Sequence, residues 1–102
     1  IVCKFVYHAG RICEVTLTGH AGYDAHGRDI VCAAVSAAAD LTVHLAEAWS
    51  EAEVSADSPG NLHVSLPTQD ETAHKLFAGL RDYLEATAQT YPQNIKIQTM
   101  EV

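Results

Sequence analysis

The stretch GHAGYDAHGRDIVCAAVSAAAD, residues 19–40, has a glycine-rich first part and an alanine-rich second part. This change in composition predicts a loop followed by a helix, and the other elements are predicted on either side of it. The segment AGYDAHG, residues 21–27, has the composition of an irregular loop. Asp29 is a good helix N-cap, and apolar residues recur at helical spacing from there to about Trp49. We therefore expect a long helix whose apolar face packs on the core. Its predicted buried positions are Ile30, Val31, Ala34, Val35, Ala38, Leu41 and Leu45.

Two strands are predicted before the loop. Residues 1–8 and the segment from Arg11 to about Thr18 alternate between apolar and polar side chains, and the sequence HAGR turns the chain between them. We expect a β-hairpin in which Cys3 and Cys13 both point inward as small buried side chains.

A second hairpin, a second helix and a final strand are predicted after the first helix. The hairpin turns at residues 57–61, and a capping box of Thr68 and Glu71 begins the helix, which ends before Pro92. Residues 94–102 form the last strand. The predicted buried side of the second helix consists of Ala73, Leu76, Phe77, Leu80, Tyr83, Leu84 and Thr87.

The element order ββαββαβ predicts an α+β fold. We expect a two-layer sandwich with a mixed or antiparallel sheet and both helices on one face. A chain of 102 residues is long enough for one domain, spanning residues 1–102, and too short for two.

Composition and charge narrow the class of protein. A net charge of −7 with only six Lys and Arg disfavours direct binding to nucleic acid. No apolar run approaches the ~18 residues that span a bilayer, and the first residues do not resemble a signal peptide, so we expect a cytoplasmic protein without membrane contact. The three cysteines form no CxxC pair and are expected to be free thiols.

Cys32 is the best candidate for a reactive group. It follows Asp29 by three residues and so lies in the first turn of the predicted helix, where free N–H groups and the helix dipole favour a thiolate. His20 ends the preceding strand, and a tight loop would return its imidazole to the sulfur as a Cys-His dyad for acyl transfer. Main-chain N–H groups at the helix start, such as that of Cys32, are the expected oxyanion donors. Ser36 lies one turn beyond on the same face.

The spacing of these residues leaves two alternatives open. Cys32 could be an inert thiol in a noncatalytic binding module, or a zinc site could be formed by Asp24, His20, His26 and Cys32. The other histidines are scattered along different elements, and no paired motif such as HxxxH supports the metal site. No cofactor is predicted.

The segment GHAGYDAHGRDIVCAAVSA closely resembles the signature of the bacterial ribosomal-processing cysteine protease family Prp. The shared pattern is Gly-His-Ala, a variable loop, a glycine, Asp-Ile-Val-Cys-Ala and a serine four residues after the cysteine. It covers Gly19 to Ser36. The rest of the chain agrees with the family in length and element order.

The resemblance implies an endopeptidase that removes the N-terminal extension of the twenty-seventh large-subunit ribosomal protein during ribosome assembly. His20 matches the family's catalytic histidine and Cys32 its nucleophile, and Asp29 and Ser36 match its supporting polar positions. Family substrates carry basic residues after the cut, and family members form homodimers. The segment that matches the mobile, substrate-gating loop is Gly22, Tyr23, Asp24, Ala25, His26, Gly27 and Arg28.

Overall fold

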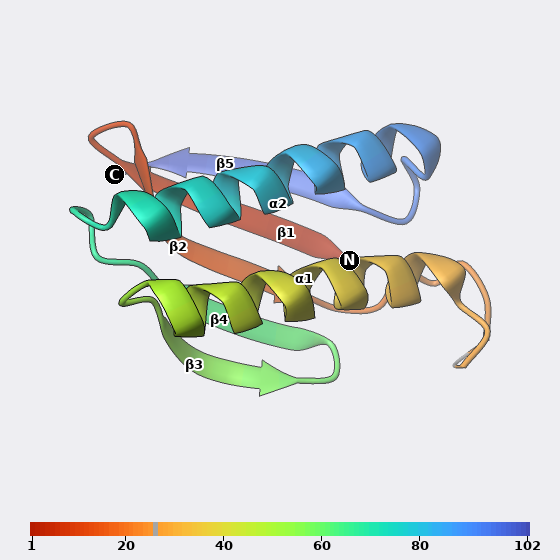
Figure 1. Cartoon of the computed structure of the whole chain (residues 1–102). Helices are drawn as coiled ribbons and strands as arrows, with labels where there is room; N and C mark the ends of the chain where they lie inside the picture. Colours follow the sequence, from red (N-terminus) through yellow and green to blue (C-terminus); the bar gives the residue numbers. More distant parts are fainter. Residues whose placement is uncertain (26) are drawn as a thin grey trace.

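Seven elements follow one another in the order ββαββαβ, which confirms the predicted order and the α+β class (Figure 1). The structure, a computed structural model, describes residues 1–25 and 27–102. The elements are β1 Val2–His8, β2 Arg11–Thr18, α1 Ile30–Trp49, β3 Glu53–Ser58, β4 Asn61–Ser65, α2 Glu71–Thr90 and β5 Lys96–Glu101.

The five strands form one mixed sheet in the order β3-β4-β2-β1-β5. β1 and β5 are parallel, and the other three pairs are antiparallel. Both helices lie on the same face of the sheet, as expected (Figure 1). The core fills the space between these two layers. Its largest fully buried side chains are Cys3, Phe5, Ile12, Val15, Val31, Val64, Phe77 and Leu84.

The β1–β2 hairpin corrects the predicted position of Cys13. The two-residue turn has positive φ at Ala9 and Gly10, at 51° and 79°, which matches the twist of the flanking strands. A bulge then follows, because Val6 pairs with Glu14 whereas Tyr7 pairs with Ile12. The extra residue shifts the alternation by one position. Ile12 therefore takes the buried place, and Cys13 is only half-buried instead of pointing into the core.

The buried face of α1 is also shifted from the predicted one. Ile30 and Leu41 are 57% and 61% exposed, contrary to expectation. Apolar residues surround most of this helix, so their periodicity alone does not identify the face that meets the sheet. The residues that α1 buries are Val31, Val35, Ala39, Thr42, Val43 and Ala46.

α2 begins differently from the predicted capping box. Asp70, not Thr68, is the N-cap, because its side chain accepts a hydrogen bond of 2.9 Å from the amide of Ala73. The segment before it forms a turn, in which the Asp70 amide donates to the carbonyl of Pro67. The helix ends at Thr90, before Pro92, as predicted. Tyr83, predicted to be buried, is about half exposed.

By length and composition alone, α1 is apolar enough to cross a membrane, which corrects the expectation that no such run exists. It is the one such helix in the described part of the chain. In the structure α1 covers the sheet and contributes Val31, Val35 and Ala46 to the core. One side of this helix therefore packs into the core, and its outer surface also carries apolar side chains.

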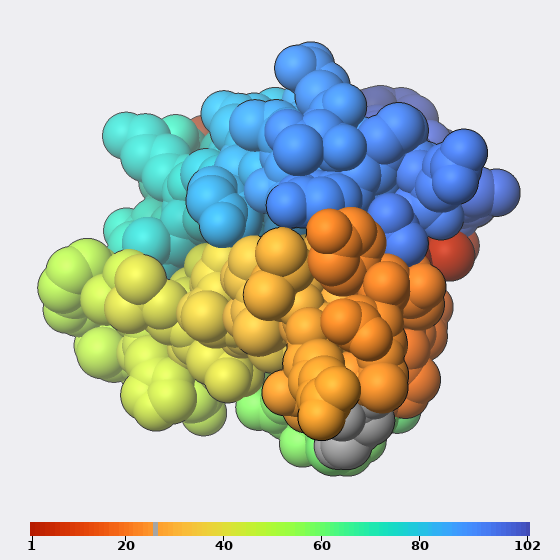
Figure 2. All heavy atoms as spheres, turned by 90° about the vertical axis from the view of Figure 1, so that its right-hand side faces the viewer, coloured from red at the N-terminus to blue at the C-terminus, as the bar shows by residue number. Residues whose placement is uncertain are grey.

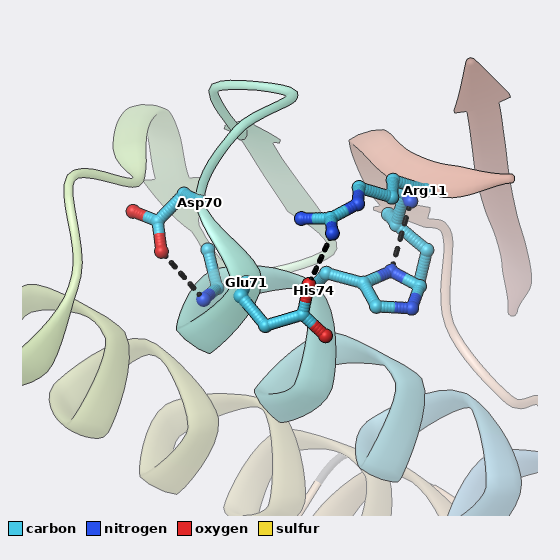
Figure 3. A network of polar contacts seen from close by, with 6 residues as sticks. Arg11, Asp70, Glu71 and His74 are labelled. Carbon is cyan, nitrogen blue, oxygen red and sulfur yellow. Dashed lines mark hydrogen bonds and ion pairs between the residues drawn. The ribbon is translucent and has the colours of Figure 1, made fainter. Parts of the chain in front are cut away.

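The N-terminal end of α2 is tied to the bulge of the first hairpin by polar contacts (Figure 3). The amide of Ile12 donates to Nδ1 of His74 over 3.0 Å in a part-buried position, so the ring carries its proton on Nε2. Arg11 forms an ion pair with Glu71 beside it.

We expect His74→Ala to destabilise the protein by about 1–3 kcal/mol, because the amide of Ile12 loses its acceptor. His74→Asn is the matched control, since its side-chain oxygen can occupy the place of Nδ1. Urea unfolding followed by the fluorescence of Trp49 measures both variants. Equal losses of stability in the two would contradict this role of the hydrogen bond.

Candidate active site

Cys32 lies in the first turn of α1, at the position that the sequence predicts. Asp29 is the N-cap, in an extended conformation, and its Oδ1 accepts a hydrogen bond of 2.9 Å from the amide of Cys32. This bond corrects one expectation, because the Cys32 amide is already engaged and is not a free donor for an oxyanion. The amide of Ala33 likewise donates to the carbonyl of Asp29.

The sulfur of Cys32 receives a hydrogen bond from the main chain of the preceding loop. The amide of Ala21 donates to Sγ over 3.1 Å. Amide donors and helix N-termini are the surroundings in which reactive protein thiols are commonly found. The thiol is half-buried, so a reagent or substrate can still approach it.

The other two cysteines have different surroundings. Cys3 is fully buried in the core, and this burial raises the pKa of its thiol to about 11. Cys13 is half-buried at the bulge of the first hairpin. Of the three thiols, the sulfur of Cys32 is the one that combines a helix start, an amide donor and a position in a cleft.

Asp29 connects the loop to the start of α1. Its Oδ2 accepts hydrogen bonds from the amides of Tyr23, at 2.9 Å, and Asp24, at 3.3 Å, while Oδ1 caps the helix. The carboxyl group is buried, with 8% of the residue exposed. The hydrogen bond from the Cys32 amide is the main cause that lowers the pKa of Asp29, and burial opposes it in part. Asp29 thus fixes the loop and the nucleophile candidate relative to each other.

We expect Asp29→Ala to lower the melting temperature by several degrees at pH 7, because the N-cap and both loop contacts are lost. The pKa of Asp29 is lowered in the folded state, so the ionised carboxylate stabilises the fold at all pH values above its ordinary pKa of 3.8. That contribution disappears as the pH falls below 3.8. Thermal unfolding measured from pH 7 to pH 2.5 should therefore show the difference between wild type and variant shrinking in acid. Glu47→Ala, at an exposed site, is the control. If the melting temperatures of wild type and Asp29→Ala differ by the same amount at every pH, the stabilising role of the ionised Asp29 carboxylate is contradicted.

His20 follows β2 at a point where Gly19 turns the chain. Gly19 has a φ of 86°, and its amide donates to the carbonyl of Gly60 in the β3–β4 turn. The imidazole lies against Gly60, where an added Cβ would be 3.0 Å from Cε1 and 3.1 Å from Nε2. Gly60 therefore leaves room for the ring. Among the residues that the structure describes, no hydrogen bond joins this imidazole to the sulfur of Cys32.

A cleft of about 720 Å³ brings the predicted residues together. His20, Asp29, Cys32 and Ser36 all line it, with β4 and the β3–β4 turn forming the facing wall. Ser36 is exposed and lies one turn beyond Cys32 on the same helix face. The cleft thus contains a thiol, an imidazole and enough space for a short peptide segment.

Two carboxylates of the cleft were missed by the sequence reasoning. Asp40 and Asp57 line its walls from α1 and β3. Asp40 was detectable, because Cys32, Ser36 and Asp40 are spaced by four residues and share a helix face. Asp57 was predicted only as part of a turn, and no pattern in the sequence indicates that this turn lies opposite α1.

The candidate gating loop makes several contacts with the rest of the molecule. Gly22 and Gly27 have positive φ, at 65° and 86°, as expected for chain reversals. The rings of Tyr23 and Tyr91 pack in a T-shaped arrangement, with centroids 5.3 Å apart. In Figure 2 the orange loop lies between the blue end of α2 and the green β3–β4 turn. The predicted loop residue His26 lies outside the described residues, and gating remains a prediction.

The zinc alternative requires several ligand side chains that converge on one point. In residues 1–25 and 27–102, no three His, Cys, Asp or Glu side chains converge as metal ligands. The remaining residue of the proposed set, His26, is outside this part of the chain.

The chain resembles known proteins in sequence and in fold. The sequence model of the family described as cysteine protease Prp matches residues 1–96. Among curated proteins no match is found.

Solved structures share the whole fold. One is an essential ribosomal processing protease Prp from Staphylococcus aureus in complex with a covalently linked product peptide. It has a TM-score of 0.90 and 24% identity, and the alignment covers 97% of this chain and 98% of that chain. SMU.848 from Streptococcus mutans has a TM-score of 0.83 and 28% identity over 99% and 94% of the two chains. A complex of the S. aureus protease with a substrate peptide has a TM-score of 0.82 and 22% identity over 96% and 97%.

Proposed function

Because the chain belongs to the Prp family of cysteine proteases, we propose that it is an endopeptidase in which Cys32 is the nucleophile and His20 the general base. The observation that carries this assignment is the hydrogen bond from the Ala21 amide to Cys32 Sγ at the start of α1, in a cleft that His20 also lines. Ser36 and Asp29 support the site from the same helix.

The reaction proceeds by acyl transfer. His20 takes the thiol proton, and the Cys32 thiolate attacks the carbonyl carbon of the scissile bond. The imidazolium then gives this proton to the leaving amine, and an acyl-enzyme remains. Water, deprotonated by His20, attacks the thioester, and the acid product leaves with the thiol restored. Contacts between base and nucleophile are often loose in a free enzyme and tighten when substrate binds, which fits the separate positions of the two side chains here.

The proposed substrate is the N-terminal extension of the twenty-seventh large-subunit ribosomal protein, removed during ribosome assembly. The S. aureus proteins with this fold are described as ribosomal processing proteases, and one is bound to a substrate peptide. Membership of the same family supports this proposal for the present chain. The cleft lies between α1 and the β3–β4 turn, and its volume of about 720 Å³ has room for a short peptide segment.

The test is mass spectrometry of a synthetic peptide that spans the extension and the first residues of the mature ribosomal protein. We expect a single cut at the boundary. A second peptide of the same composition in scrambled order is the control, and it should stay intact. Cleavage of both peptides, or of neither by folded and reduced protein, would reject the proposed specificity.

Asp40 and Asp57 are proposed to select the basic residues that follow the cut. Asp40 lies eight residues beyond Cys32 on one helix face, about 12 Å along the axis, which is the reach of three to four extended residues. Neither carboxylate has a salt-bridge partner among the described residues, so both can meet a substrate cation.

We expect Asp40→Asn and Asp57→Asn each to lower kcat/KM about three- to tenfold for a peptide with lysines after the cut, with a larger effect at low salt. The same peptide with alanines in place of the lysines should be cut equally by wild type and variants. Glu47→Gln, outside the cleft, is the control variant. Equal losses on both peptides would show that the carboxylates act on something other than substrate charge.

We also propose that the protein is a cytoplasmic homodimer that binds neither membranes nor nucleic acid directly. Support for the dimer comes from an apolar groove of about 480 Å³ between the outer surfaces of α1 and α2, where Leu41 and Tyr83 are exposed. Light scattering measures the molecular mass of the purified protein. We expect the mass of a dimer for wild type and of a monomer for Leu41→Glu, and a dimer in both would show that this groove does not join the two copies.

A further inference from the structure

Asn94 connects the last part of the chain to the residue that contacts the nucleophile. It lies in the turn between α2 and β5, and its Nδ2 donates to the carbonyl of Ala21 over 2.9 Å in a part-buried position. The main chain of Asn94 is itself held. Its amide donates to Tyr91, and its carbonyl accepts a hydrogen bond of 2.8 Å from the main-chain nitrogen of Ile1. The side-chain amide therefore projects from a fixed point.

Ala21 is held from two sides. Its amide donates to Cys32 Sγ, its carbonyl accepts from Asn94, and its side chain is buried, with 6% of the residue exposed. Glycines at positions 19 and 22 flank this short segment, both with positive φ. Glycine gives the backbone many alternative conformations, so a contact within the segment is needed to keep one of them. Asn94 supplies that contact on the carbonyl side of Ala21.

Tyr91, at the start of the same turn, makes a second contact with the loop. The ring of Tyr91 packs against Tyr23, two residues after Ala21. Figure 2 shows blue residues of the C-terminal part of the chain lying directly against the orange loop. The α2–β5 turn is therefore a continuous support for the segment from Ala21 to Tyr23.

We propose that Asn94 is a positioning residue for the nucleophile, which acts by holding the Ala21 amide on the sulfur of Cys32. This inference rests on the proposed role of Cys32, and it adds a residue that the family signature in residues 19–36 does not contain. Hydrogen bonds to ionised groups are stronger than those to neutral ones, so the Ala21 amide stabilises the thiolate more than the thiol. Loss of the Asn94 contact lets the segment move and weakens this preference.

The experiment is the rate of alkylation of Cys32 by iodoacetamide between pH 5 and pH 10, measured by mass spectrometry of the cysteine-containing peptides. We expect Asn94→Ala to slow the reaction about tenfold at pH 6 and to approach the wild-type rate above pH 9, where thiols in general form thiolates without a donor. Asn94→Asp keeps the size of the side chain but cannot donate to the Ala21 carbonyl, and it should behave in the same way. Gln93→Ala, at the exposed neighbouring position, is the matched control and should match wild type.

Cys3 is fully buried, so its alkylation, measured in the same mass spectra, shows whether the fold has opened. A pH profile at Cys32 that is unchanged in both Asn94 variants would overturn the proposal. Alkylation of Cys3 in both variants would also overturn it, because Asn94 would then hold the fold as a whole. Alkylation needs no peptide substrate, so the positioning role can hold even if the protein cuts no ribosomal peptide. With a cleavable peptide, the Asn94 variants should lower kcat and leave KM nearly unchanged.

Discussion

Cys32→Ala abolishes peptide cleavage, with an expected loss of at least about 10⁴-fold in kcat, because the described residues that line the cleft include no second thiol. The fold survives, since the removed sulfur is half-buried at a helix start and leaves no large cavity in the core. Initial rates on the extension peptide and the melting temperature measure the two effects.

Two further variants make this prediction specific. Cys32→Ser replaces sulfur by a hydroxyl that does not ionise at neutral pH, and it should be as inactive as the alanine variant. Cys13→Ala removes a thiol with the same degree of burial but outside the cleft, and it should keep full activity. Cleavage by either Cys32 variant above about one per cent of the wild-type rate would refute the nucleophile assignment.

His20→Ala lowers kcat by about 10²- to 10⁴-fold and leaves KM within a few fold, because proton transfer is lost while the walls of the cleft remain. The pH profile of kcat/KM should change in the variant, because the proposed general base is absent. Steady-state kinetics from pH 5 to pH 9 give both readouts.

His8→Ala is the control for the histidine variant. His8 is exposed at the end of β1, paired with Arg11, whereas His20 lies beyond Thr18 at the opposite end of the same hairpin. Removing it should change neither kcat nor the pH profile. A wild-type profile in His20→Ala would assign the general base to another group.

The sequence predicts the element order because each element carries its own local signal. Asp29 before an apolar run indicates the start of α1, and HAGR marks the first turn. These signals depend on neighbours within a few residues. The same locality explains why Cys32 was placed correctly: its position relative to Asp29 is set by a single helical turn.

The wrong predictions concern side chains whose burial depends on contacts between elements that are distant in the sequence. Cys13 was predicted to point inward, but a bulge in β2 turns it away from the core. The bulge arises from the pairing of β2 with β1, which the local sequence does not reveal. Leu41 was expected to be buried, but α1 is apolar on several sides, and contact with the sheet selects which side is covered. Asp57 faces the cleft because the β3–β4 hairpin lies beside β2, and this order of strands is not encoded in any short stretch of sequence.

The parallel pairing of β1 with β5 also bears on how the protein is made. Val2 pairs with Lys96, so β1 and β5 meet at the edge of the sheet only after the chain has been synthesised beyond Lys96. Both hairpins and α1 are synthesised earlier, and with them the thiol and the imidazole. Asn94 lies two residues before β5 and reaches Ala21 only after α2 has been made. A growing chain therefore carries the thiol and the imidazole before it carries Asn94, and this support is added only when the segment before β5 has been synthesised.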